Sequence, residues 1–496
     1  MRVSASSRSL ITMLCLMAAL LLSACGGSSG GDVTATATQP ETGDVTFTRE
    51  PATFRVDGDT GSDSHSIALA MVGGGGPWQS IQHALDQARP GDTIQVLRAE
   101  QPYSGARSAS VVDPAGIILN TSGEAGLSIT LEGVPDAQGR RPVIDQGRTV
   151  PDDVAPVAGL LLNCVSHVTV RGFEIRHAND AGITTSLSGC EHQGLAIEDN
   201  IVYEITGVGY VAGIRLVQTR NSLVRGNRLH GITVSPTLTV DDPPRLVNST
   251  VPTENNRIEH NDIGNLAVAV HIRGRGAQPL SVHSVEKNRI HNVETGLLLT
   301  ADTARPAAIN NTTFTGNLVY DVDLASDEGH AVDVQLGLSG IQSSGLNIAL
   351  NTLVNIDQPL RLAGMADVRI LENILTSADS DLLLSIAPQT PDIVNRFAFI
   401  DNNLYFGNAA TSWTLASGGA PETRFLSLPA WRQAFSAITH PELLADPDLL
   451  SLETDPLFID PTQADFSLLI DSPATTLGSN GGQIGAYFDG DEPGVR

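Results

Sequence analysis

One short phrase recurs through the middle of the chain: a hydrophobic residue, two variable residues, an asparagine, one variable residue and a second hydrophobic residue. Its asparagines are Asn200, Asn227, Asn261, Asn288, Asn317, Asn351, Asn373 and Asn402. Repetition at intervals of 22 to 34 residues predicts a solenoid in which each phrase marks one coil. Asparagine tolerates the left-handed conformation of a tight corner, and its amide can bond to the asparagine one coil above. We therefore expect an asparagine ladder.

The segments between the asparagines predict strands. Runs such as AGITTS (181–186), AVHIRG (269–274) and AVDVQL (331–336) alternate with period two and lack a helical period. A leucine-rich repeat would also place an asparagine after alternating leucines. However, its LxxL lead-in is missing here and a third strand stands in the place of its helix. The pattern favours an all-β, right-handed parallel β-helix.

Both ends of the solenoid carry closing signals. Residues 77–88 place Trp78, Ile81, Leu85 and Ala88 on one helical face, and Arg-Pro-Gly-Asp at 89–92 stops that helix. Near the other end, LPAWRQAF (428–435) predicts a short helix, and DPLF, DFSL, SPA and IGA follow within residues 455–486. From about residue 78 to residue 489 the chain resembles the pectate-lyase-like superfamily of β-helix proteins.

A chain of 496 residues has room for a solenoid of about eleven coils, because solenoids grow in one dimension. The resemblance implies a short N-terminal capping helix and an irregular C-terminal cap. The expected organisation is a signal peptide at 1–24, a flexible tether at 25–50, an N-terminal segment with the capping helix at 51–91, the parallel β-helix at 92–408 and a closing segment at 409–496.

The first residues predict export. Arg2 and Arg8 precede an apolar run that ends in Leu22-Ser23-Ala24-Cys25. This ending resembles the bacterial lipobox, which implies lipidation of Cys25 and, with Gly26 next, sorting to the outer membrane. The side of that membrane on which the body lies stays open. Without the signal peptide the net charge is −28, from 27 basic and 55 acidic residues. So acidic a body argues against nucleic acid and against an anionic membrane surface as partners. We expect a monomer.

Two cysteines remain after lipidation. Cys164 and Cys190 lie 26 residues apart, close to one coil. A disulfide between stacked coils is chemically allowed in an exported protein, and two buried thiols are the alternative.

The asparagines also set a register for the third strand of each coil. With hydrophobic positions inside, the outward column is Thr184, Arg215, Thr233, His271, Leu298, Asp333 and Arg361, and a parallel column two residues later is Ser186, Val217, Ser235, Arg273, Thr300, Gln335 and Ala363. Loops at 235–254 and 300–311 follow these strands and would border the face as a groove.

The superfamily resemblance implies an extracellular polysaccharide on this face, and the strand register makes Arg215 and Arg361 the candidate substrate-binding residues. If the polymer carries uronates and is cleaved, β-elimination needs a base and a neutralising cation. The candidates are His271 as the base, Arg273 and Arg361 as cations, and Asp333 either orienting the histidine or holding calcium together with Asp302.

Other interpretations remain. An inverting hydrolase needs two carboxylates and would have to recruit Asp241, Asp242, Asp327 or Glu328 from loops. Outward arginine, histidine and aspartate also commonly form a solvated face with cross-strand charge pairs. The lyase and polygalacturonase signatures of the superfamily are missing, and only a fragment, GHA at 329–331, is present. His230, His260, His283 and His291 lack metal-ligand spacing and are expected at corners and on the surface. We therefore expect an envelope lipoprotein that binds an extracellular polysaccharide and, if it is an enzyme, cleaves it as a lyase rather than as a hydrolase; the alternative is a non-catalytic adhesin or envelope scaffold.

Overall fold

The structure is a computed structural model that describes residues 49–105, 107–109, 113–148, 155–187, 189–207, 211–234, 254–276, 278–302, 304–322, 329–336, 342–377, 382–386, 397–407, 412–415, 423–438 and 448–486. The chain divides into two units, residues 1–50 and 51–496, and the fold described below belongs to the second. Cys25 and the signal-peptide residues lie outside the described residues. None of the described helices is both long enough and apolar enough to cross a membrane.

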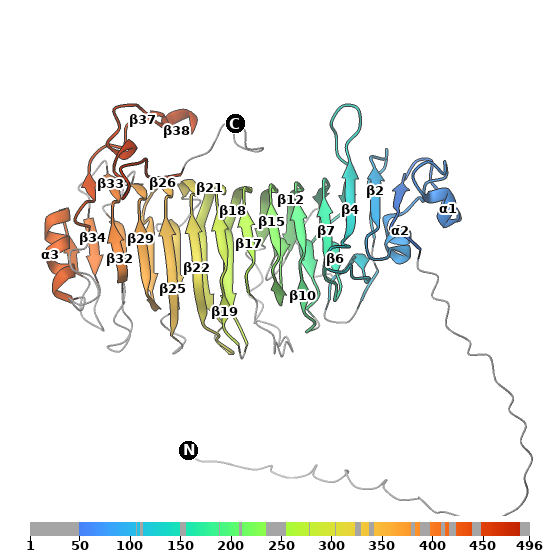
Figure 1. The fold of residues 1–496 in the computed structure, drawn as a ribbon, viewed down its shortest axis with the longest axis horizontal. Helices are drawn as coiled ribbons and strands as arrows, with labels where there is room; N and C mark the ends of the chain where they lie inside the picture. The colour runs from blue at the N-terminus through green and yellow to red at the C-terminus, as the bar shows by residue number, and fades with distance from the viewer. Residues whose placement is uncertain are drawn as a thin grey trace, which may run out of the picture. The chain divides into compact units, whose positions relative to one another are not determined.

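Parallel strands stack along one axis in this unit (Figure 1). Sheet 1 holds the strands that precede each asparagine: β1 (Thr53–Val56), β2 (Thr93–Leu97), β4 (Ile129–Val134), β7 (Val168–Arg171), β11 (Ala196–Glu198), β15 (Leu223–Arg225), β17 (Arg257–Glu259), β20 (Ser284–Glu286), β22 (Ile309–Thr315), β25 (Ser343–Ala349), β29 (Val368–Leu371) and β32 (Phe397–Asp401). The short strands β19 (Leu280–Ser281) and β28 (Met365–Ala366) pair beside it, and β10 (His192–Gln193) pairs with β14 (Thr219–Arg220).

Sheet 2 holds the strands that follow each asparagine: β5 (Val143–Asp145), β8 (Glu174–Arg176), β12 (Ile201–Gly207), β16 (Arg228–Val234), the first halves of β18 (Asp262–Gly274) and β21 (Arg289–Ala301), then β23 (Leu318–Val322), β26 (Thr352–Ile356), β30 (Ile374–Ser377), β33 (Leu404–Gly407) and β36 (Leu452–Glu453). Strand β21 pairs with β23 through its first half and with β24 through its second. The two long strands therefore continue into the third sheet.

Sheet 3 consists of two runs in the described part of the chain. The first run is β3 (Ala115–Leu119), β6 (Val157–Leu162), β9 (Ala181–Thr185) and β13 (Ala212–Arg215). The second run is the second halves of β18 and β21, then β24 (His330–Gln335), β27 (Leu360–Ala363), β31 (Leu382–Ile386), β34 (Ser412–Leu415) and the antiparallel β35 (Thr423–Phe425). Three parallel sheets wound by one chain confirm the expected all-β, parallel β-helix solenoid.

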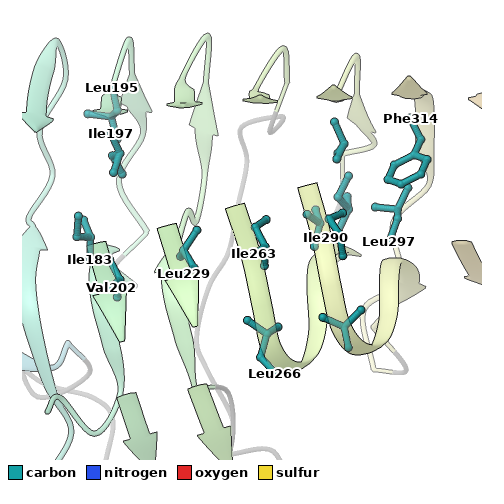
Figure 2. Close-up of a cluster of buried hydrophobic side chains, with 14 of the residues drawn as sticks. Ile183, Leu195, Ile197, Val202, Leu229, Ile263, Leu266, Ile290, Leu297 and Phe314 are labelled. Carbon is teal, nitrogen blue, oxygen red and sulfur yellow. The ribbon is translucent and has the colours of Figure 1, made fainter. Parts of the chain in front are cut away.

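The core consists of aliphatic residues stacked on equivalent residues of the next coil. Ile263, Ile290 and Val319 follow one another in register on sheet 2 and are 0–4% exposed. Figure 2 shows this packing, with side chains of all three sheets directed inward between the strands. Because each coil buries its apolar positions only against its neighbours, the core extends from coil to coil without a globular centre.

A buried asparagine ladder runs along the corner between sheets 1 and 2. The Asn288 side chain donates to the Ile258 carbonyl and to Asn317 Oδ1, and its oxygen accepts from the backbone N–H and the amide of Asn261. These four hydrogen bonds are 2.8–3.0 Å long. The last member of the ladder was wrongly predicted: Asn403, rather than Asn402, accepts from Asn373.

The left-handed residue of this corner is the one before each ladder asparagine. Lys287 (φ 52°), Leu350 (φ 55°) and Asn402 (φ 57°) hold this position in their coils, and glycine holds it in two others. The expectation that the asparagine itself takes the left-handed conformation is therefore wrong. Its function is to satisfy backbone groups of the corner, and the preceding residue bears the strain.

Helices lie at both ends of the solenoid (Figure 1). Short helix α1 (Ile67–Ala70) precedes α2 (Ile81–Gln87), which begins later than predicted, so Trp78 lies outside the helix. Ile81 and Leu85 are each 1% exposed, as the helical face predicted, and Trp78 is buried to the same extent. The Gln82 amide donates to the Ile118 carbonyl and accepts from its N–H, both at 2.9 Å. This contact satisfies backbone groups of β3, the first strand of sheet 3, and so protects its edge. At the opposite end, α3 (Leu428–Ile438) occupies the predicted LPAWRQAF segment.

Residues 457–486, here called the C-terminal strap, pack on the outer face of sheet 2. The strap contains β37 (Phe458–Asp460), the short helical turns η2 (Pro461–Gln463) and η3 (Pro473–Thr475), and β38 (Asp465–Leu468). Phe458 and Phe466 pack against Leu318, Tyr320 and Val354. Farther along, Ile484 packs against Ile374 and Leu404. The strap therefore covers the coils from β23 to β33.

Cys164 and Cys190 form a disulfide with 5.4 Å between their Cα atoms. The bond links the corners that precede β7 and β11, two strands that pair in parallel. It therefore covalently joins neighbouring coils.

Candidate functional site

The predicted outward register of sheet 3 is present in the second run. His271 lies beside Leu298, Leu298 beside Asp333, and Asp333 beside Arg361. The second column aligns Arg273, Thr300, Gln335 and Ala363 in the same way. In the first run, Thr184 lies beside Arg215. The asparagine phrase thus gave the correct strand register in both runs.

The predicted column was wrong between the two runs, where it passed from Arg215 through Thr233 to His271. Thr233 belongs to β16 and lies beside Thr206 of β12, so it is part of sheet 2. Ser235 and the loop at 235–253 lie outside the described residues. Arg215 and His271 therefore belong to separate runs of strands, and a continuous column from one to the other is not established.

Arg215 is part of a buried ion pair. Its guanidinium bonds to Asp180 and donates to Thr184 Oγ1 at 3.0 Å, and the side chains of Arg215 and Asp180 are only 11% and 14% exposed. Thr184 and Ser186 were expected to point outward into solvent, but both are 0% exposed. Arg215 lies over Thr184, and a carboxylate oxygen of Asp113 accepts from Ser186. These contacts make this end of the face structural.

A denser group lies where β18 and β21 end, and we call His271, Arg273, Arg275, Thr300 and Asp302 the Asp302 cluster. Arg273 Nη2 lies 2.8 Å from Asp302 Oδ2, and Arg275 Nε lies 3.5 Å from the same oxygen. The Asp302 side chain is 2% exposed, whereas each arginine side chain is 23% exposed. One buried carboxylate therefore holds two guanidinium groups at the surface.

Asp302 is also bound to the loop that follows it. Its Oδ1 accepts the backbone N–H groups of Ala304 and Arg305, both at 2.9 Å. Burial alone would raise the pKa of Asp302, but these N–H groups and the two arginines outweigh burial and lower it. Asp302 therefore stays ionised and fixes the two arginines relative to the turn.

His271 stands beside Arg273 on the outward face. Its Nε2 lies 2.7 Å from Thr300 Oγ1, and part of the ring reaches solvent. The surrounding protein atoms and the positive charge of Arg273 lower the pKa of His271 to about 4. The imidazole is therefore neutral at neutral pH and has the protonation state that a general base requires.

Asp333 is bound by neighbouring side chains. Arg361 donates to both carboxylate oxygens at 2.8 and 2.6 Å, and Gln335 donates to Oδ2 at 2.6 Å. The Asp333 side chain is 2% exposed and the Arg361 side chain is 29% exposed. Asp333 lies one coil beyond Leu298 rather than beside His271, so its contacts orient Arg361 and not the histidine.

The two candidate calcium ligands do not fit that metal. Calcium takes six to eight oxygen ligands, but Asp302 and Asp333 direct their oxygens to arginine, glutamine and backbone N–H groups. Within the described ranges, three or more His, Cys, Asp or Glu side chains do not come together as a metal site. Asp241, Asp242, Asp327 and Glu328, the carboxylates required for hydrolysis, lie outside those ranges.

Arg275 was missed by the sequence analysis although the sequence contained a signal. It follows Arg273 at the spacing that returns a strand residue to the same face, although β18 itself ends at Gly274. Its bridge to Pro306 continues the strand edge by one step.

A second polar surface was also missed. Outward residues of sheet 2 form a row that we call the sheet-2 strip: Asp145, Arg176, Tyr203, His230, Gly264, His291 and Tyr320. Tyr203 stacks on His230 with ring centroids 5.2 Å apart, and His291 stacks on Tyr320 at 5.4 Å.

The polar side chains of the strip bind other side chains of the protein. Arg176 lies 2.8 Å from Asp145, and His291 lies 3.0 Å from Asp262. These contacts connect successive coils, so we assign the strip a structural function. Of the four histidines expected at corners and on the surface, His283 is instead buried at 6% exposure.

Comparison with protein families gives one match in the centre of the chain. Residues 153–319 match the family described as "Right handed beta helix region". Among curated proteins, none matches the chain.

Solved structures of low sequence identity are similar to the chain. The lacto-N-biosidase of family GH136 from Eubacterium ramulus is 14% identical over 72% of this chain and 64% of its own, with a TM-score of 0.42. Pectate lyase Pel9A is 13% identical over 88% and 97%, with a TM-score of 0.44. The surface adhesin PfbA of Streptococcus pneumoniae is 12% identical over 73% and 89%, with a TM-score of 0.44. The chain thus spans less than two thirds of the length of the first of these enzymes.

Proposed function

We propose that this right-handed parallel β-helix binds an anionic extracellular polysaccharide on the outer face of sheet 3, at the Asp302 cluster. The carrying observation is the pair Arg273 and Arg275 on the single buried carboxylate of Asp302. The side chains of both arginines are partly exposed, each at 23%, so both guanidinium groups are within reach of a ligand. In a chain of net charge −26, this pair is a local cationic point at which an acidic polymer can be bound.

If the bound polymer is a uronate, the cluster supports β-elimination. The neutral imidazole of His271 would take the C5 proton, the C4–O bond would break with its electrons on the leaving oxygen, and a C4=C5 double bond would form. Arg273 and Arg275 would stabilise the negative charge that develops beside the substrate carboxylate. The leaving oxygen would take its proton from solvent.

The second candidate function is a non-catalytic glycan-binding adhesin or envelope scaffold. It is favoured by the state of the two carboxylates near the cluster, because both Asp302 and Asp333 are held by arginine and neither is placed as an acid or base. Under this proposal the same arginines bind the polymer and His271 contributes only to contact.

An absorbance assay separates the two functions. The purified mature protein is incubated with alginate, polygalacturonate and glycosaminoglycans, and unsaturated products are followed by their ultraviolet absorbance. A lyase gives product that His271→Ala abolishes and Arg273→Gln strongly reduces. Arg369→Gln is the matched control, because Arg369 is an exposed arginine on sheet 1.

Binding is measured in parallel on the same polymers. Retained binding without product, lost in Arg273→Gln and kept in Arg369→Gln, supports the adhesin or scaffold. Absence of both binding and product on every polymer contradicts both functions.

We further propose that Cys25 anchors the protein in the cell envelope as an outer-membrane lipoprotein. The support is the sequence ending Leu22-Ser23-Ala24-Cys25 after an apolar run. In fractionated cells, the unaltered protein should sediment with membranes and Cys25→Ser should not. Membrane association that survives Cys25→Ser contradicts the anchor.

A further inference from the structure

Arginine side chains bind the carboxylates near the proposed binding face at the positions where a calcium site would hold its metal ion. Asp302 Oδ2 receives Arg273 and lies within 4 Å of Arg275, while its Oδ1 receives two backbone N–H groups. Both oxygens of Asp333 receive Arg361, and one also receives Gln335. At both carboxylates, guanidinium groups thus occupy the positions that a bound metal ion would need.

Calcium would have to displace these donors before it could bind. Asp302 and Asp333 are each 2% exposed, and withdrawing a partner from a buried ion pair leaves an uncompensated charge. Loss of the Asp302 contacts would also release the turn at 302–305, because that turn depends on the two N–H bonds to Oδ1. Calcium uptake at Asp302 would therefore require local rearrangement.

The arginines themselves fill the chemical function that calcium would serve. A guanidinium presents N–H groups in a fixed plane that matches a carboxylate, and it stays charged at every working pH. The buried aspartate beneath each arginine fixes that plane. Asp302 and Asp333 are therefore positioning residues for Arg273, Arg275 and Arg361.

We infer that the sheet-3 face recognises carboxylate-bearing polysaccharides through arginines held by buried aspartates, and that this recognition is independent of calcium. The inference rests on the proposed function and specifies how that site binds its ligand.

The test measures the affinity of the full mature chain for short alginate and polygalacturonate oligosaccharides by calorimetry. Each titration is run once with EDTA and once with calcium in excess over the protein. The expected affinities agree within about twofold. Asp302→Asn should weaken binding about tenfold in both buffers, the loss of about one charge-assisted hydrogen bond. Asp302→Glu, which keeps the charge, should recover part of that loss.

The opposite result is a calcium effect that depends on these carboxylates. A more than tenfold gain in affinity with calcium, lost in Asp302→Asn or Asp333→Asn, would overturn the inference. Each variant is also titrated with neutral dextran oligosaccharides as a control ligand. Its circular dichroism spectrum is recorded, so that a misfolded variant is recognised. Arg275→Gln then gives a second test, because it leaves Asp302 and its turn contacts in place.

A failure of the proposed function has a different signature. If neither oligosaccharide binds in either buffer, the binding proposal is wrong. The inference then fails with it, because it describes how that site binds its ligand. If an oligosaccharide does bind, a direct titration of calcium into the unaltered protein and the Asp302→Asn variant tests the inference alone: equal heats support it, and a heat that only the unaltered protein shows contradicts it.

Discussion

Replacing Asn288 by alanine should destabilise the solenoid at its centre. The substitution removes four hydrogen bonds and leaves two buried donors on Asn261 and two buried acceptors, the Ile258 carbonyl and Asn317 Oδ1, without this partner. Asn288 and Asn317 are 0% exposed and Asn261 is 2% exposed, so water does not reach these groups without an opening of the corner. At about 1 kcal/mol for each net hydrogen bond, the expected loss is about 3–5 kcal/mol.

Denaturation in urea, followed by far-ultraviolet circular dichroism, measures this loss. Fluorescence is the less suitable probe, because Trp78, Trp413 and Trp431 all lie near the two ends of the solenoid. The control is Asn347→Ala, which removes an outward amide from β25 and should change the free energy of unfolding by less than about 0.5 kcal/mol. If Asn288→Ala costs no more than the control, the ladder does not stabilise the fold and the reasoning fails.

Three further results are expected. Replacing Cys164 and Cys190 together by serine should lower the free energy of unfolding by about 3 kcal/mol, since the disulfide closes a loop of 26 residues, and an unchanged melting temperature would contradict this. His271, whose pKa burial and Arg273 lower from 6.5 to about 4, should titrate near pH 4 in NMR spectra and closer to 6.5 in Arg273→Gln. Between pH 4 and pH 6.5 the unfolded chain therefore binds a proton at His271 that the folded chain does not. The contribution of His271 to the free energy of unfolding is complete above pH 6.5 and is lost as the pH falls toward 4. A midpoint near 6.5 in the unaltered protein would contradict that assignment. Phe466→Ala removes a partly buried ring from contacts with two other aromatic rings and should cost about 2 kcal/mol, and chemical denaturation that shows no loss would mean that the strap does not depend on it.

The fold and strand register could be predicted because both follow from local spacing. A period-two strand exposes every second residue, and the asparagine phrase fixes where each strand begins. The pairings His271–Leu298 and Asp333–Arg361 were therefore accessible from the sequence. The error at Thr233 has the same origin, because GITV at 231–234 has a strand pattern that fits sheet 2 and sheet 3 equally well.

The chemistry of the face could not be predicted, because it depends on which charges meet across coils. Asp180 and Arg215 are 35 residues apart, and their buried pair turns a proposed ligand contact into a structural one. Asp302 and Arg273 are 29 residues apart. From the sequence alone such a carboxylate could be a calcium ligand, whereas in the structure it binds an arginine. Only the structure decides between these two possibilities.

The outward positions of sheet 2 contain a further signal that a solenoid sequence can give. In the middle coils this column is charged, at Arg228, Asp262 and Arg289, whereas Leu318, Ile374 and Leu404 farther along the same column are buried beneath the C-terminal strap. An outward column that turns apolar cannot face water without cost, so the change marks where another part of the chain must lie. In the second run of sheet 3, Arg273 and Arg361 lie on the buried carboxylates of Asp302 and Asp333, and under the proposed function this is where the ligand binds.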